Sequence, residues 1–207
     1  MLDITLLLLF IPTFFLVSIT PGMCMTLAMT LGMSVGIKKT LWMMWGELLG
    51  VAIVAIAAVI GVSAVMLQHP QTFSVLKLIG AGYLAFIGIN MWRSRGKLAL
   101  SSNNVITQNI KRSTLFKQGL ITAIANPKGW AFMVSLLPPF INPELSLPPQ
   151  LAMLLLIILI SEFICMMIYA AGGSTIGKLL TKGKNIKIMN KVSGTLMMFV
   201  AIWLGLS

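Results

Sequence analysis

Six long runs of apolar residues divide this sequence, and they constrain its fold more than any other feature. A helix needs roughly 20 apolar residues to cross the hydrocarbon core of a bilayer. Only 9% of the 207 residues are charged, against about 25% in soluble domains. The sequence therefore predicts an all-α integral membrane protein with six transmembrane helices in one domain, residues 1–207, and no soluble catalytic domain. The runs span approximately 4–36, 41–67, 72–92, 115–141, 149–176 and 189–206.

The cationic residues gather in alternate connections between the runs. Of the 15 Lys and Arg residues, 13 lie in the first, third and fifth connections, at 36–40, 93–117 and 178–191. Cytoplasmic loops of membrane proteins concentrate Lys and Arg. The pattern predicts that these connections face the cytoplasm and that both termini lie outside. The basic residues then contact anionic membrane lipids, and no nucleic acid is expected as a partner.

The two halves of the chain are predicted to be inverted repeats. Residues 94–114 are polar enough to form a cytoplasmic linker, which separates a first triplet of runs, 1–93, from a second, 115–207. Because three is an odd number, the second triplet enters the membrane from the opposite side. This is the inverted-topology arrangement from which many secondary transporters are built.

The first run of each triplet contains a proline beside small or polar residues. The first run has Thr20-Pro21-Gly22 and the fourth has Asn126-Pro127-Lys128. Proline removes a backbone donor and glycine does not enforce helical geometry. A helix of the length of the first run, about 50 Å, also exceeds a hydrocarbon core of about 30 Å. We therefore predict that the first and fourth helices are broken at Pro21 and Pro127, around a substrate site, although a plain proline kink without a ligand is the alternative.

Three ionisable side chains are predicted to lie within the membrane. Glu47 and Glu162 lie in the second run of each triplet, and Lys128 follows the second break. A buried charge near the bilayer centre costs about 2.5 to 3.5 kcal/mol on insertion scales, so such residues are usually functional. Glu47 and Glu162 are candidates for carrying a proton or holding an amine, and Lys128 for attracting a carboxylate. The alternative is that Lys128 and Glu162 only neutralise one another.

These motifs resemble the lysine exporter (LysE) superfamily, most closely its homoserine and threonine exporter branch. The resemblance covers essentially the whole chain, in the right order. It rests on Thr20-Pro21-Gly22, on Gly32, Gly36, Gly46-Glu47 and Gly50, on Leu76 to Leu84 with Gly88, and on Asn126-Pro127-Lys128 with Phe132, Pro138 and Phe140.

The resemblance implies a six-span exporter of amino acids or their derivatives that works by exchange with protons. The chain departs from the family at two positions. Met23 stands where proline usually follows Thr-Pro-Gly, and Glu47 stands where aspartate is common. The second departure keeps the carboxylate and lengthens its side chain by one methylene. The pattern implies no cofactor and leaves a homo-oligomer open.

Soft-metal efflux and a channel are the alternative functions. Met23, Cys24 and Met25 lie beside the first break, and sulfur ligands favour Cu(I). However, the 16 methionines are spread through every run, as expected for apolar filler, so no metal site is predicted. An enzyme is not expected, because the one histidine, His69, lies in a short loop without a neighbouring acid.

Overall fold

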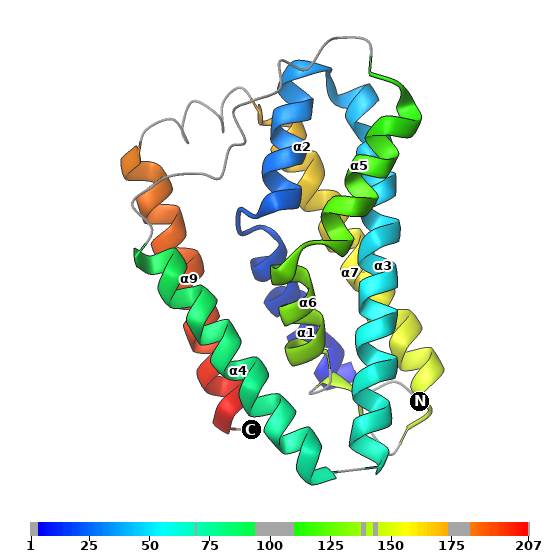
Figure 1. Cartoon of the computed structure of the whole chain (residues 1–207), viewed down its shortest axis with the longest axis vertical. Helices are drawn as coiled ribbons and strands as arrows, with labels where there is room; N and C mark the ends of the chain where they lie inside the picture. The colour runs from blue at the N-terminus through cyan, green and yellow to red at the C-terminus, as the bar shows by residue number, and fades with distance from the viewer. Residues whose placement is uncertain are drawn as a thin grey trace.

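The computed structural model describes residues 4–68, 70–93, 110–137, 140–142, 145–173 and 183–206. All regular structure in these ranges is helical (Figure 1), in agreement with the all-α prediction. Helix is found in each of the six apolar runs. The helices are α1 (Ile4–Ser18), α2 (Met23–Ser34), α3 (Ile37–Gln68), α4 (Pro70–Arg93), α5 (Arg112–Ile124), α6 (Pro127–Leu136), α7 (Leu147–Ala171) and α9 (Gly183–Leu206).

Two of the described helices are long and apolar enough to cross a membrane without interruption. They are Ile37–Gly61 within α3 and Leu147–Ala171, which is α7. A third span results if Phe10–Ser18 and Met23–Ser34 are counted together, since these two helices are separated by a short break and bent by 58°. The chain is therefore a helical membrane protein in which a broken helix accompanies continuous ones.

The first helix is interrupted over residues 19–22, between α1 and α2. Pro21 lies within this break, as the sequence predicted, and Gly22 is the N-cap residue of α2 with an extended backbone. A second proline, Pro12, lies inside α1 without ending it. Proline alone therefore does not decide where this helix stops, and the following glycine contributes.

The second interruption lies at residues 125–126, one residue before the predicted position. Pro127 is not inside the break but is the first residue of α6. Proline is favoured there because its missing N–H has no partner in the first helical turn and its fixed φ suits the helix. Asn126 caps this helix, and its Oδ1 accepts a hydrogen bond from the Lys128 backbone N–H at 3.1 Å.

Helices of each half of the chain pack against helices of the other half. Helix α3 packs most extensively on α5 and also contacts α6, whereas α7 packs on α2 and α1. Helices α4 and α9 run side by side as a pair at one side of the molecule and have far fewer contacts with the rest (Figure 1). The acid-bearing helix of each half thus contacts both parts of the broken helix of the other half.

Three glycines allow α3 and α5 to approach closely. A Cβ atom on Gly46 would lie 1.9 Å from the Phe116 carbonyl oxygen, and one on Gly119 would lie 2.0 Å from that of Met43. A Cβ on Gly50 would lie 2.6 Å from the Ala123 Cβ. Helices in membranes associate through small residues of this kind, so α5 is fixed against α3 just before the second break.

The connection between α6 and α7 is held by one buried side chain. Gln150 is 4% exposed, and its Oε1 accepts a hydrogen bond from the Asn142 N–H at 2.8 Å. Its Nε2 donates to the carbonyl oxygens of Asn142, Leu145 and Ser146 at 3.0 to 3.2 Å. This side chain satisfies several backbone groups of the connection and so fixes the start of α7.

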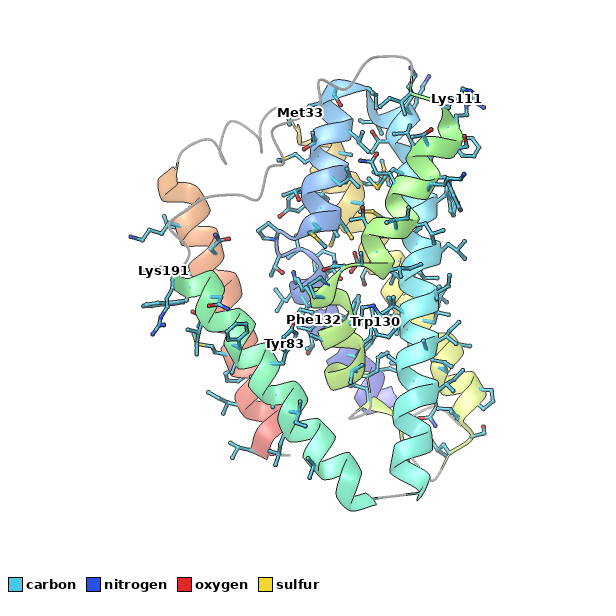
Figure 2. The ribbon with its side chains drawn as sticks, viewed as in Figure 1. Met33, Tyr83, Lys111, Trp130, Phe132 and Lys191 are labelled. Carbon is cyan, nitrogen blue, oxygen red and sulfur yellow. The ribbon has the colours of Figure 1, made fainter. Side chains whose placement is uncertain are left out.

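Four basic residues of the first and third connections lie at the same end of the molecule. Lys38 and Lys39 begin α3, and Lys111 and Arg112 begin α5 beside the end of α2 (Figure 2). Helix α5 begins at Arg112, inside the range predicted as the linker. Residues 94–109 of that linker, His69, and residues 174–182 of the fifth connection lie outside the described part of the chain.

Candidate functional site between the two helix breaks

A cavity of about 50 Å³ lies where the two breaks meet. A water molecule needs roughly 10 to 15 Å³ of such a cavity, so there is room for a few water molecules or a small polar group. Every helix of the two broken pairs contributes to its wall, together with α3 and α7. The lining residues are Phe14, Val17, Ser18, Thr20, Gly22, Cys24, Met25, Glu47, Val51, Val54, Ala123, Asn126, Lys128, Gly129, Phe132, Met133 and Glu162.

Lys128 connects the second break to the first. Its Nζ donates to the backbone carbonyl oxygens of Val17 at 3.4 Å and Thr20 at 3.2 Å, and to the Thr20 hydroxyl. The last carbonyl groups of a helix have no partner within the helix and carry a partial negative charge. The ammonium group of Lys128 therefore caps the C-terminal end of α1, and it also lies over the Phe132 ring, 5.7 Å from Nζ to the ring centroid.

Glu162 lies on α7 opposite the end of α1. Its Oε1 accepts a hydrogen bond from Ser18 Oγ at 2.9 Å. The carboxyl group is close enough to Lys128 to interact electrostatically, but the hydrogen bonds of Lys128 go to the α1 backbone and to Thr20. The two side chains are neighbours in one polar group rather than a direct ion pair.

Glu47 lies on α3 and is 1% exposed. Neither of its carboxyl oxygens has a hydrogen-bond partner in the described part of the chain. The Glu162 carboxyl is its electrostatic neighbour, and the Cys24 thiol, a weak donor, lies beside it. A buried polar atom without a partner is rare in folded proteins and calls for an explanation, and here the side chain borders a cavity.

Asn126 and Cys24 join the two breaks on another side of the cavity. Asn126 Nδ2 donates to Cys24 Sγ at 3.7 Å, while the Asn126 Oδ1 caps α6. A Cβ on Gly22 would lie 3.6 Å from Lys128 Nζ, so the backbone of the first break passes close to this ammonium group. The N-terminal ends of α2 and α6 therefore both lie at the cavity.

The structure brings together six of the eight residues that the sequence analysis selected. Pro21 and Pro127 do not line the cavity; they lie in or next to the breaks that form it. The roles of all eight residues stay predictions. The six lining residues are Thr20, Gly22, Glu47, Asn126, Lys128 and Glu162.

Sequence reasoning missed several side chains that hold the site together. Ser18 lies two positions before Thr20, and the sequence gave no separate signal for it. Tyr169 Oη donates to the Ile19 carbonyl oxygen of the first break at 2.9 Å, and Trp130 Nε1 donates to the Ile124 carbonyl oxygen of the second at 2.8 Å. A tyrosine or tryptophan inside an apolar run is a usable signal, because its polar group needs a partner when buried.

The cavity wall is polar at one level and apolar at the next. On α1, α3 and α6 a polar lining residue is followed one turn away by an apolar one. Side chains four residues apart lie on the same face of a helix. The pairs are Ser18 with Phe14, Glu47 with Val51, and Lys128 with Phe132.

Comparison with protein families decides what kind of protein carries this site. A family model described as LysE type translocator matches residues 15–207. The chain belongs to this family. A LysE-type translocator is a membrane transport protein, which confirms the prediction of a transporter rather than an enzyme and the resemblance seen in the sequence.

Relatives of this LysE-type translocator include named efflux proteins. A homoserine/homoserine lactone efflux protein of Salmonella typhimurium is 29% identical over 188 residues, which cover 89% of this chain and 88% of that protein. A leucine efflux protein of an Enterobacter species is 28% identical over 129 residues, 62% of this chain and 60% of that protein. An uncharacterized membrane protein of Vibrio cholerae is 28% identical over 197 residues, 95% of each chain. No solved structure matches the chain.

These findings do not favour soft-metal efflux. Within the described ranges, no three His, Cys, Asp or Glu side chains are grouped as metal ligands. Cys24 accepts a hydrogen bond from Asn126, and Met23, next to it, is 44% exposed. In this LysE-type translocator, Cys24 and Met25 line the cavity and Met23 does not, so the three sulfur atoms do not form one group of ligands.

Proposed function

We propose that this chain is a six-span secondary transporter that exports amino acids or their close derivatives in exchange for protons. The observation that carries the proposal is the convergence of Glu47, Lys128 and Glu162, from three different helices, on one cavity between two helix breaks. Ionisable side chains inside a membrane mark ion and substrate pathways. The named homoserine/homoserine lactone and leucine efflux relatives support amino acids as the exported class.

The packing supports an inverted repeat of residues 1–93 and 115–207, joined by a cytoplasmic linker at 94–114. Exchanging the two triplets turns the contact of α3 with α5 and α6 into that of α7 with α1 and α2. The same exchange leaves the α4 and α9 pair unchanged. Transporters of this kind place their substrate at the interface of the repeats, where discontinuous helices supply the binding groups.

In the proposed site, the helix breaks and the ionisable side chains together supply groups of opposite charge. The breaks at Thr20, Pro21 and Gly22 and at Asn126 and Pro127 expose the N-terminal ends of α2 and α6. These ends favour a carboxylate, and the positive charge of Lys128 adds to them. Glu47 and Glu162 then hold the ammonium group of the solute or the exchanged proton.

The orientation that we propose follows the basic residues. The end of the molecule with Lys38, Lys39, Lys111 and Arg112 faces the cytoplasm, where positive loops are concentrated and anionic lipids attract them. Both termini then face outward from a bacterial-type inner membrane. In this orientation export moves the solute from the basic end toward the opposite one.

Purified protein in proteoliposomes provides the test. The vesicles are loaded with a mixture of amino acids, and efflux is followed with and without a pH gradient whose protons run opposite to the solute. We expect a subset of amino acids to leave, and the gradient to accelerate their efflux. An efflux rate that is the same with and without the gradient would support a channel, and no release of any amino acid would contradict the proposal.

The Glu162→Gln variant tests proton coupling. The amide keeps the size of the side chain and can still accept the Ser18 hydrogen bond, but it cannot bind and release a proton. We expect the gradient to lose its effect on efflux while the protein remains folded and inserted. Glu144→Gln is the matched control, because this acid lies outside the apolar runs. Efflux by Glu162→Gln that responds to the gradient as the wild type does would exclude a coupling role.

A further inference from the structure

The two acids at the cavity have different surroundings. Glu162 accepts a hydrogen bond from Ser18 at 2.9 Å and lies within the field of Lys128. Glu47 is 1% exposed, lines the cavity, and has no hydrogen-bond partner among the described residues. One carboxyl group is thus part of a network within the protein, and the other is not.

Glu47 is not paired with the cationic side chain that lines the cavity. Lys128, the cation that lines the cavity, is engaged with the carbonyl oxygens at the end of α1. The neighbours of Glu47 are the Glu162 carboxyl, which is of like charge, and the Cys24 thiol, which is only a weak donor. Burying a carboxylate without a partner is expensive, whereas pairing it with a cation and satisfying its oxygens offsets that expense. An ammonium group entering the cavity supplies both.

The wall beside Glu47 is apolar in one direction. Val51 and Val54 follow it on α3 at the spacings of one and two turns, and all three line the cavity. Phe14 of α1 lines the same level. These apolar residues belong to a buried cluster that also contains Phe10 and Phe140, packed with ring centroids 5.0 Å apart. The apolar level therefore ends in packed side chains.

We propose that an exported α-amino acid lies along α3, with its ammonium group at Glu47 and a short aliphatic side chain against Val51 and Phe14. This inference rests on the proposed function. Glu162 keeps its hydrogen bond with Ser18 and balances the charge of Lys128. It therefore helps to hold the polar side chains of the cavity in place and does not contact the ammonium group. The apolar level of the cavity selects against charged side chains.

Ligand binding to the detergent-purified full chain tests the ammonium contact. L-norvaline and pentanoate share a carboxylate and an aliphatic chain, but only norvaline has an ammonium group. Apparent dissociation constants are taken from the rise of the melting temperature with ligand concentration, so that a variant without transport activity can still be measured. We expect norvaline to bind at least about tenfold more tightly than pentanoate, as for a buried charge pair.

The variants separate the two acids through the ratio of these constants. Glu47→Gln should reduce the preference for norvaline toward one, and Glu47→Asp should restore part of it. Glu162→Gln should leave the ratio unchanged even if both ligands bind more weakly. Equal binding of norvaline and pentanoate to the wild type, or loss of the preference in Glu162→Gln rather than Glu47→Gln, would overturn the inference. The wild-type result stands even if Glu47→Gln fails to fold.

A second variant tests the apolar level. Val51→Ala enlarges this level, so the affinity for norleucine should rise about fourfold relative to that for norvaline. This is the effect expected for one more buried methylene group. Ile53→Ala is the matched control, because Ile53 is on the same helix but 45% exposed. An unchanged ranking in Val51→Ala would contradict the pose. If amino acids are exported but neither norvaline nor norleucine binds, the side-chain class is wrong and the proposed function remains.

Discussion

The two helix breaks look alike in sequence but are held in different ways. The break at residues 19–22 depends on side chains that are distant in the chain, from α6 and α7. The break at residues 125–126 is held mainly by residues within six positions of one another, with one weak hydrogen bond from Asn126 to Cys24. The comparison separates a break that the local sequence specifies from one that the tertiary structure maintains.

The first break has local hydrogen bonds at its N–H and hydroxyl groups, whereas several of its carbonyl groups accept from distant side chains. Thr20 Oγ1 donates to the Val17 carbonyl oxygen at 2.7 Å within the same turn. The Ile19 carbonyl oxygen accepts from Tyr169 Oη, 150 residues away, and those of Val17 and Thr20 accept from Lys128, 111 and 108 residues away. The groups freed by this break are satisfied only while α6 and α7 stay in place.

The second break is satisfied from both sides by its own neighbours. Asn126 caps α6 with its side chain, Pro127 starts that helix, and Trp130 Nε1 donates to the Ile124 carbonyl oxygen. Helix α5 is in addition fixed to α3 by the close glycine contacts. We infer that the second break acts as the rigid side of the site, and that the first is the side whose geometry changes when helices move.

The largest effect is expected from Lys128→Met, which removes the connection between the breaks. Hydrogen bonds to charged groups contribute about 1.5 to 3 kcal/mol, which corresponds to a change of roughly 10- to 100-fold in a transport rate or a binding constant. We expect efflux to fall by this amount, and the backbone N–H groups of Ile19 and Thr20 to exchange hydrogen faster by mass spectrometry. Lys128→Arg is the control that keeps the charge. Unchanged exchange at the first break would show that Lys128 does not hold it.

The second largest effect is expected from Asn126→Ala. Loss of an N-cap costs about 1 kcal/mol, and the change should act more on the second break than on the first, toward which it removes only the weak hydrogen bond to Cys24. Faster hydrogen exchange of the Ala125 and Asn126 N–H groups, measured beside that of Ile19, checks the prediction. Asn126→Ser should retain most of the cap. Exchange that rises equally at both breaks would contradict their separation.

A smaller effect, confined to the first break, is expected from Tyr169→Phe. Hydrogen bonds between membrane helices contribute about 0.6 kcal/mol on average, and this variant removes only the one to the Ile19 carbonyl oxygen. Labelling of a cysteine introduced at Met23, next to the break, should become faster. If the labelling rate rises instead at a cysteine introduced at Ala125, the assignment of Tyr169 to the first break is wrong.

The smallest effect is expected from Trp130→Phe. The indole is 37% exposed, and Asn126 and Pro127 still specify the start of α6 without it. We expect a change of at most about 0.6 kcal/mol in the free energy of unfolding and little change in efflux. A loss of efflux as large as that of Lys128→Met would show that the second break also depends on contacts beyond its cap.

Much of the fold could be predicted from the sequence because it depends on local patterns. Apolar runs long enough for a bilayer predicted where the described helices lie. The second break was predicted to within one residue, since Asn-Pro forms a helix start through its own side chain and ring. The three ionisable residues stood out because charges in an apolar run are expensive. The number of spans, the inverted repeat and the role of each site residue stay predictions.

The sequence by itself determined the helical membrane class, the family and the ionisable residues of the site, because hydropathy, proline and charge act over a few neighbouring positions. Only the tertiary structure decided which groups meet. It gave Lys128 to the end of α1, Ser18 to Glu162 and Tyr169 to the first break, and among the described residues it left both carboxyl oxygens of Glu47 without a hydrogen bond. Such pairings join residues more than 100 positions apart, and they depend on how closely glycine lets the helices approach, which no local pattern encodes.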